Sequence, residues 1–296
     1  MMKNLKKITV LILTAALAAA GIITAAADGY ILYAGYTFSL NNRMATIHSY
    51  EGSGELYIPA SIWGYTVVGI EDSAFFGRDD FDALVLQEST RLTSIGSNAF
   101  YRCSGFTRAE LPPRVETLGE CAFQYCRGLR TADCSAAQLT AIERQTFYGC
   151  TLLEQVALPD TLQTIGDLAF GECPSLTYVG IPLAVTEIAD TAFSGDADLT
   201  LGVWLDSVAY TYAQENGFAY RLLDPVMLGD ANSDGQVNIQ DVTVIQRYLV
   251  ELEDLSELEL KAADANQDGA LDIADATTLQ MYLADYALPY PIEETV

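Results

Sequence analysis

The chain has 296 residues and a formal net charge of −25 at pH 7, from 40 acidic and 15 basic side chains. A charge of this size opposes binding to nucleic acid or to anionic lipid and favours cations. Half of the residues are hydrophobic, so the chain is not intrinsically disordered despite its charge.

The first 27 residues have the features of a secretory signal peptide. Three lysines precede an apolar run over residues 8–24, and the small residues 25–27 before Asp28 fit a cleavage site. The run is also long enough to be considered a membrane anchor. Its high alanine and glycine content and the cleavage site favour a signal peptide over residues 1–27.

Residues 36–50 predict the first β-structure of the exported chain. Apolar and polar residues alternate on both sides of Asn41 and Asn42, which is the pattern of two strands joined by a tight turn. We expect this segment and the short apolar segments after it to form an N-terminal hairpin cap.

A repeat of 23 to 25 residues occupies the centre of the chain. It is marked by a phenylalanine, preceded by alanine in five copies and by Thr146 in the remaining one, with an aliphatic residue five positions earlier. The six phenylalanines are Phe75, Phe100, Phe123, Phe147, Phe170 and Phe193. A fixed period with apolar residues at fixed offsets indicates stacked coils, each of which buries its apolar face only against its neighbours.

This repeat predicts a solenoid with a parallel sheet on one side. Segments such as residues 153–158 and 176–181 are expected to be strands, and the Ile-Gly-x-x-Ala-Phe segments are expected to be turns that cover the other side. The phenylalanines then form a structural ladder inside the solenoid, not a cofactor site. Residues 207–217 begin with serine and end with glycine, which predicts a capped closing helix.

The repeat resembles the BspA-like leucine-rich repeats, notably over residues 158–173. The resemblance extends over residues 30–223 and includes the opening hairpin and the closing helix. It implies a leucine-rich repeat domain over residues 28–224, in a secreted or cell-surface protein that acts as a binding scaffold. It does not identify the ligand, because one fold serves many functions.

Four of the six cysteines stand three residues after the repeat phenylalanine, at Cys103, Cys126, Cys150 and Cys173. A small apolar thiol stacked in a solenoid core explains this spacing without disulfides, although disulfides are common in exported proteins. Cys121 and Cys134 lie outside the register, and whether they pair is open. A zinc site is disfavoured because ligands of the right kind are not closely spaced.

The strand face of the predicted solenoid is polar. One row comprises Ala83, Arg108, Thr131, Gln155 and Tyr178, with Glu110, Arg130, Asp133 and Glu154 beside it. A carbohydrate platform usually displays several aromatic side chains, whereas this row has one, so protein recognition is slightly favoured over glycan recognition. An ordinary solvated surface is the alternative.

The sequence shows no recognisable catalytic constellation. His48, the single histidine, lies in the predicted hairpin without a nucleophile motif beside it, so a Ser-His or Cys-His mechanism lacks its base. Glycoside hydrolysis needs only two carboxylates, but the repeats and caps leave no room for a catalytic domain. We therefore predict that the protein is not an enzyme.

The last quarter of the chain contains the same kind of loop twice, at residues 230–241 and 264–275, 34 residues apart. Both loops have oxygen-bearing side chains at positions 1, 3, 5, 9 and 12, and glycine at position 6, where the chain must turn sharply. This is the ligand pattern of an EF-hand calcium loop, to which position 7 adds its carbonyl. Residues 226–296 hold 15 acids and 2 bases, a charge that two calcium ions would partly neutralise.

An apolar stripe at helical spacing follows each loop, over residues 242–249 and 276–283. Pro225 and Gly229 oppose a helix before the first loop, and position 12 is Asp where the usual EF-hand has Glu. This duplicated loop-and-helix unit resembles the type I dockerin of cellulosomal proteins, over residues 225–292. The resemblance implies calcium-dependent folding and docking onto a cohesin module of a scaffolding protein.

The resemblance also assigns residues. The calcium ligands would be Asp230, Asn232, Asp234, Gln236, Asn238 and Asp241 in the first loop, and Asp264, Asn266, Asp268, Ala270, Asp272 and Asp275 in the second. Gln236 and Ala270 would act through their backbone carbonyls. The cohesin contacts would be Ile239, Gln240, Gln246 and Arg247 in the first copy, and Ile273, Ala274, Gln280 and Met281 in the second. The well-known clostridial modules have a hydroxyl pair at loop positions 10 and 11 that this chain lacks, so the identity of the cohesin stays open.

Together these features predict a secreted, non-catalytic bacterial protein of a cellulosome-like, polysaccharide-degrading complex. Its dockerin would attach it to the scaffold, outside the cell or at the cell surface, while the repeats recognise a protein or a glycan. The alternative is a structural spacer or an inhibitor-type regulatory subunit of that complex, and a glycoside hydrolase is the least favoured interpretation. Binding to nucleic acid, or to a membrane after signal cleavage, is not expected.

Overall fold

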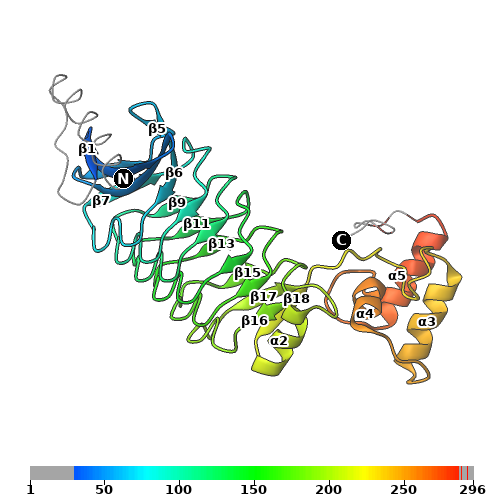
Figure 1. Ribbon diagram of the computed structural model, residues 1–296. Helices are drawn as coiled ribbons and strands as arrows, with labels where there is room; N and C mark the ends of the chain where they lie inside the picture. The colour runs from blue at the N-terminus through cyan, green and yellow to red at the C-terminus, as the bar shows by residue number, and fades with distance from the viewer. Residues whose placement is uncertain (1–29, 287, 289–291, 293–296) are drawn as a thin grey trace. The chain divides into compact units, whose positions relative to one another are not determined.

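The computed structural model describes residues 30–286, 288 and 292, which form two compact units that divide between Arg221 and Leu222. The first unit is a β-solenoid and the second is a small helical unit (Figure 1). The predicted signal peptide, residues 1–27, lies outside the described residues. Within them, no helix has both the length and the apolar character needed to span a bilayer.

The solenoid begins with the predicted hairpin cap. Strands β1 (Ile31–Tyr33), β2 (Tyr36–Asn41) and β3 (Met44–Tyr50) pair antiparallel. The tight turn consists of Asn42 and Arg43, both at positive φ, so it lies one residue later than the sequence pattern indicated. Strand β3 then pairs in parallel with β6 (Tyr65–Ile70), against which β5 (Ser61–Ile62) folds back. The cap thereby gives the first coil a strand to stack on.

One side of the solenoid is the predicted parallel sheet. Strands β4 (Gly54–Tyr57) and β7 (Phe81–Val85) form its first pair. They are followed by β9 (Arg108–Glu110), β11 (Thr131–Asp133), β13 (Gln155–Ala157), β15 (Tyr178–Gly180) and β17 (Thr200–Val203), one strand per coil (Figure 1). Arg108, Thr131 and Gln155 lie side by side in register across β9, β11 and β13, as the repeat spacing predicts.

A second ladder of strands runs where the sequence indicated only turns. It consists of the two-residue strands β8 (Ser94–Ile95), β10 (Thr117–Leu118), β12 (Ala141–Ile142), β14 (Thr164–Ile165) and β16 (Glu187–Ile188). In parallel, β6 pairs with β8, β8 with β10, β12 with β14 and β14 with β16, which gives these coils a second line of hydrogen bonds to their neighbours. These strands form because buried backbone amides and carbonyls must be paired. A two-residue strand is too short to show an alternating pattern in the sequence.

The predicted phenylalanine ladder forms the core of the solenoid. The six rings are buried, and each stacks on the next with centroids 5.0–5.5 Å apart and planes 5–18° from parallel. Ring stacking of this kind adds to the stabilisation that burial alone provides. The ladder fixes the spacing of the coils.

A ladder of thiols runs beside the rings, and all six cysteines of the chain are free. Each thiol of the register donates to the carbonyl oxygen of an earlier repeat phenylalanine, as Cys103 does to Phe75 at 3.0 Å and Cys126 does to Phe100 at 3.0 Å. Burial raises the pKa of Cys103 to about 12, so this thiol stays protonated and unreactive. The alternative of a Cys121–Cys134 disulfide is not realised.

Charged residues replace cysteine at both ends of this thiol ladder. Arg78 occupies the equivalent position in the first copy, where its guanidinium lies over the Phe81 ring at 4.4 Å. Asp196 occupies it in the last copy, where Oδ1 accepts the Cys173 amide at 2.6 Å and the buried Oδ2 has no partner among the described residues. Burial, with a smaller contribution from the charge of Glu172, raises the pKa of Asp196 to about 7.

The solenoid ends at the predicted helix, α2 (Val208–Asn216). Ser207 caps its start by accepting the Tyr210 amide, and Gly217 ends it in the left-handed conformation, at φ 72°. Tyr212 of this helix packs on the last ring of the ladder, Phe193, at 6.2 Å. Strand β18 (Ala219–Leu222) pairs with β17 and completes the unit.

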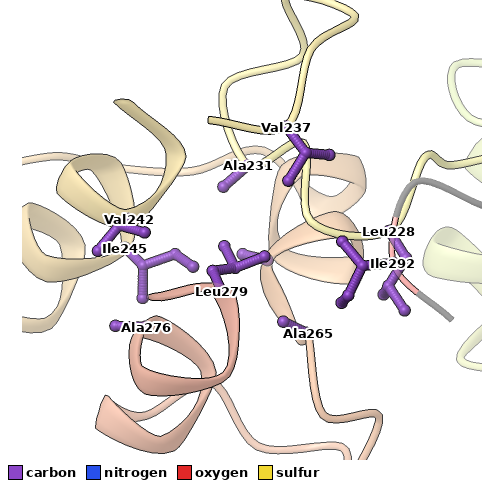
Figure 2. Close-up of a cluster of buried hydrophobic side chains, with 10 residues drawn as sticks. Leu228, Ala231, Val237, Val242, Ile245, Ala265, Ala276, Leu279 and Ile292 are labelled. Atoms are coloured by element: carbon purple, nitrogen blue, oxygen red, sulfur yellow. The ribbon is translucent and has the colours of Figure 1, made fainter. Parts of the chain in front are cut away.

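The second unit contains helices α3 (Ile239–Leu249), α4 (Glu257–Ala263) and α5 (Ile273–Leu283). The predicted exit helices are α3 and α5, and both start three residues earlier than the apolar stripes did. Helix α4, before the second loop, was not predicted, although Ser256 and Glu259 form the capping box that begins it. Leu279 of α5 lies among the labelled side chains of the shared core, which includes Ile245 of α3 (Figure 2).

We expect Phe147→Ala to lower the free energy of unfolding of the solenoid by roughly 3–5 kcal/mol, the usual cost of deleting a buried ring. Phe147 is buried and stacks on Phe123 and Phe170. Gln155→Ala on the exposed strand face is the control and should cost under about 0.5 kcal/mol. The measurement is melting followed by tryptophan fluorescence, since both tryptophans lie in the first unit. Equal shifts for the two variants would contradict the stacked core.

Asp196 should make the solenoid less stable as the pH rises. Its folded pKa of about 7 lies above the unfolded value of about 4. Between these values the folded state therefore binds more protons, and stability falls with rising pH. Asp196→Asn should raise stability at pH 8 by up to roughly 4 kcal/mol, and this gain should shrink towards pH 4. A gain that is constant across pH would show that the carboxyl does not titrate in this range.

Candidate calcium loops and binding surfaces

The first candidate calcium loop is held in shape by bonds from its own backbone amides. Asp230 at position 1 accepts the amides of Asp234 and Gly235 at 3.0 and 2.9 Å. Asn232 at position 3 accepts the Asp234 amide at 3.0 Å, and Asp234 at position 5 accepts the Gln236 amide at 2.9 Å. Gly235 at position 6 has φ 82°, so the sharp turn expected there is present.

The second candidate loop repeats this geometry. Asp264 accepts the amides of Asp268 and Gly269 at 3.1 and 2.9 Å. Asn266 accepts the Asp268 amide at 2.9 Å, and Asp268 accepts the Ala270 amide at 2.9 Å. Corresponding bonds in the two loops thus differ by about 0.1 Å at most, which shows that the sequence repeat is also a structural repeat.

The residues at loop positions 9 and 12 join each loop to the helix that follows it. Asn238 caps α3 and Asp272 caps α5, each in a capping box with the aspartate three residues later. These aspartates, Asp241 and Asp275, also accept the amide of position 3 of their own loops at 3.2 Å. One carboxylate therefore links the start of the loop, its end and the first turn of the helix.

The electrostatics of both loops favour a cation. Asp241 and Asp275 are fully buried, and burial raises the pKa of each carboxyl. The neighbouring negative charges raise the pKa further, from Asp230 and Asp234 in the first loop and from their counterparts in the second. A divalent cation bound among these carboxylates would offset the repulsion between them. Oxygen-rich sites of this kind suit calcium.

As they stand, the described residues contain no group of three or more His, Cys, Asp or Glu side chains arranged to hold a metal ion. The carboxylates are turned towards backbone amides, and amide or carbonyl oxygens make up part of each predicted ligand set. A carboxylate oxygen can accept more than one bond, so amide hydrogen bonds can organise the loop and still leave lone pairs for an ion. The oxygen donors present in both loops thus suit calcium.

The eight residues predicted to contact a cohesin are all exposed. Ile239 and Ile273, at loop position 10, are 61% and 62% exposed, which is unusual for isoleucine and equal in the two copies. The copies differ at Arg247, whose Nε forms an ion pair with Glu253 at 3.1 Å, whereas Met281 stands at the equivalent place. Arg247 is therefore not a free cation, a feature that the sequence did not reveal.

On the solenoid, all residues of the predicted strand-face row except Ala83 line a shallow groove of about 500 Å³. Arg108, Gln155 and Tyr178 line it, and Tyr178 is 42% exposed. Two arginines of this face are neutralised within the protein, Arg108 by Glu110 and Arg130 by Glu154. The face is polar with one exposed aromatic ring, as predicted, and it carries little free positive charge.

Sequence reasoning missed a side-chain cluster in the cap. The Glu71 carboxylate lies 3.0 Å from His48 Nδ1 and accepts the hydroxyls of Tyr30 and Ser39, each at 3.0 Å. The Tyr30 ring stacks on His48 at 4.1 Å. The Ser39 hydroxyl is committed to the carboxylate and not to the imidazole, so the cluster lacks the arrangement of an activated nucleophile.

Comparison with protein families matches two regions of the chain. Residues 68–200 match six copies of the BspA type leucine rich repeat region. Residues 228–284 match the dockerin type I domain. Type I dockerin domains bind calcium, and neither family is catalytic. No curated protein is similar to the chain.

Solved structures of leucine-rich repeat proteins match the chain in part. A leucine rich cell surface protein from Faecalibacterium prausnitzii is 27% identical with a TM-score of 0.44, and the match covers 60% of this chain and 55% of that one. A leucine-rich repeat protein from Bacteroides ovatus is 20% identical with a TM-score of 0.41, over 57% and 52%. For the leucine-rich repeat protein of T. pallidum the values are 27%, 0.39, 57% and 69%. The chain spans about half the length of the first two.

Calcium should fold the second unit. The 15 carboxylates in residues 225–296 repel one another until the ions bind, so the free energy of binding becomes free energy of folding. Circular dichroism of this segment should show a gain of helix when calcium is added and a loss when it is chelated. Spectra that do not respond to either would contradict the assignment.

Proposed function

We propose that this chain, which joins a BspA-type leucine-rich repeat region to a type I dockerin domain, is a secreted, non-catalytic binding subunit of a cellulosome-like, polysaccharide-degrading complex. A dockerin implies binding to a cohesin module. The observation that carries the proposal is the pair of equivalent loops, each with an exposed isoleucine at position 10, where its helix begins. Polysaccharide breakdown would be a property of the complex, and localisation would be extracellular or at the cell surface through the scaffold.

The proposed organisation is a signal peptide over residues 1–27, a repeat domain over 28–224 and a dockerin over 225–292. Two calcium ions would be held, one per loop. The ligands would be Asp230, Asn232, Asp234, Gln236, Asn238 and Asp241 for the first ion and Asp264, Asn266, Asp268, Ala270, Asp272 and Asp275 for the second. The ions would fix the first turns of α3 and α5, because the position-12 carboxylates already link loop and helix in both copies.

Two orientations on a cohesin follow from the internal symmetry. The copies match at the exposed positions Ile239 and Ile273 and at Gln246 and Gln280, so either helix could meet the same cohesin surface, related by about a half turn. Arg247 makes the first copy the better match for an acidic cohesin, provided that its ion pair with Glu253 opens on docking. We therefore infer that one orientation dominates.

The repeat region is proposed as the recognition module of this subunit, with a protein or a glycan as its target. Its coils hold surface side chains at fixed spacing through two ladders of parallel strands. A rigid surface loses little conformational entropy when it binds, which favours recognition.

Charge substitution at the isoleucines tests the docking surface. Ile239→Asp should weaken binding to a type I cohesin strongly if the first copy docks, and Ile273→Asp if the second does. The double variant should lose binding, since a buried unpaired charge at an interface costs several kcal/mol. The measurement is calorimetric titration of the calcium-loaded chain with a panel of type I cohesin modules.

Leu183→Asp is the matched control, because Leu183 is 62% exposed and lies in the solenoid. It should leave cohesin binding unchanged. Calcium binding should survive in every variant, since neither isoleucine is a proposed ligand. Undiminished cohesin binding by the double variant would place the contact elsewhere.

A further inference from the structure

A row of aromatic side chains runs along the turns that follow the repeat phenylalanines. Phe76 stacks on Tyr101 with centroids 4.6 Å apart and planes 9° from parallel. Tyr101 meets Tyr125 edge to face at 5.8 Å, and Tyr125 meets Tyr148 at 5.5 Å. The row crosses four consecutive coils, and Phe76 at its end is 53% exposed. Together with two neighbouring arginines, this row forms a surface that we call the aromatic–arginine edge: Phe76, Tyr101, Arg102, Tyr125, Arg127 and Tyr148.

The two arginines place positive charge on this row. The Arg102 guanidinium lies 5.4 Å from the Tyr101 ring centre and 5.7 Å from that of Tyr125, and the Arg127 guanidinium lies 5.7 Å from that of Tyr125. Both side chains are exposed, and neither forms an ion pair within the described part of the chain. A guanidinium stacked on a ring keeps its N–H donors available.

The backbone beneath the edge is fixed and strained. The residue two positions after the repeat phenylalanine has positive φ in all six copies: Gly77, Arg102, Tyr125, Gly149, Glu172 and Gly195. Glycine is the residue with least strain there, yet Arg102 and Tyr125 occupy it in adjacent coils. The Arg102 amide donates to the Gln124 carbonyl at 2.8 Å, and the Tyr125 amide donates to that of Tyr148 at 2.8 Å, which locks coil to coil.

Gly149 leaves space for the Tyr125 ring of the preceding coil. A Cβ at Gly149 would lie 2.5 Å from Cδ1 of Tyr125, so the ring rests on the glycine of the next coil. The left-handed backbone at Arg102 and Tyr125 belongs to the repeat, since Glu172 adopts it at the same position of a later coil. These two positions hold a cation and a flat ring side by side.

We propose that the aromatic–arginine edge binds an extended acidic polysaccharide, a chain of uronic acid sugars. Sugar carboxylates would pair with the guanidinium groups of Arg102 and Arg127, which recognise carboxylates through two parallel hydrogen bonds. The apolar C–H faces of the sugars would pack on the exposed parts of the aromatic rings. The proposal deepens the proposed function, because it names the ligand of the repeat module and rests on that module's role in recognition.

Charge and shape favour this ligand over an acidic protein. The chain is strongly negative overall, which opposes anionic polymers in general, so an anionic ligand has to pair directly with the exposed guanidinium groups of Arg102 and Arg127. The edge is a narrow row that repeats coil by coil, which matches a linear polymer with one charge per unit. It lies outside the groove of the strand face, whose arginines are already paired.

The test is calorimetric titration of the calcium-loaded chain with three probes: oligogalacturonides too short to gel with calcium, their methyl esters and poly-L-glutamate. We expect the oligogalacturonides to bind, the uncharged esters to bind at least about tenfold more weakly, and poly-L-glutamate not to bind. Arg102→Gly with Arg127→Gln should weaken oligogalacturonide binding by about tenfold or more. Arg108→Gln with Arg130→Gln removes the same charge from the strand face and should leave binding unchanged.

The melting temperature of each variant shows whether a loss of binding comes from a loss of folded structure. Because glycine suits the left-handed backbone at position 102, the Arg102→Gly change should not lower the melting temperature. Failure of the wild-type chain to bind oligogalacturonides, equal binding by the two arginine double variants, or equal binding of poly-L-glutamate would overturn the proposal. Cohesin binding is measured on the same samples. Absence of cohesin binding would contradict the proposed docking function alone. Absence of sugar binding with intact cohesin binding would contradict only the proposal that the aromatic–arginine edge binds a polysaccharide.

Discussion

Every coil of the solenoid is completed by its neighbours, and the rest of the structure depends on this stacking. The Phe147 ring has a ring on each side, and its amide donates to the Ala169 carbonyl of the next coil. A single coil would leave both faces of its ring, and the amides that bond to adjacent coils, in water, so no coil is stable alone. The hairpin cap and α2 close the two ends and convert an open stack into a finite unit.

The second unit follows the same logic on a smaller scale. Neither loop-and-helix copy has a core of its own, because Val242 and Ile245 of α3 pack with Ala276 and Leu279 of α5 in one shared cluster (Figure 2). Repulsion among loop carboxylates opposes this packing. Folding of the unit is therefore linked to cations, whereas folding of the solenoid depends on apolar burial.

The sequence predicted what is periodic and missed what depends on the path of the chain. The ring ladder, the thiol ladder, the strand-face register and both loops follow from residue spacing alone. The two-residue strands such as β8 and β10 could not be seen, because they exist only through pairing with adjacent coils. The Arg247–Glu253 ion pair depends on how the chain leaves α3. The aromatic–arginine edge was missed because Tyr125 lies two residues after its repeat phenylalanine, whereas the other three rings lie one residue after theirs, so no single register displays all four.

The charged residues at the two ends of the thiol ladder limit where the solenoid can gain additional repeats. The four internal coils present the same small thiol to both neighbours, so any one of them can follow another. Arg78 and Asp196 occupy the same position only in the outermost copies, next to the cap and next to the closing helix. Duplication of an internal coil would lengthen the solenoid with its packing unchanged, whereas duplication of a terminal coil would place a second charged residue in the thiol ladder. Growth of the repeat array is thereby confined to its middle, and its ends stay constant.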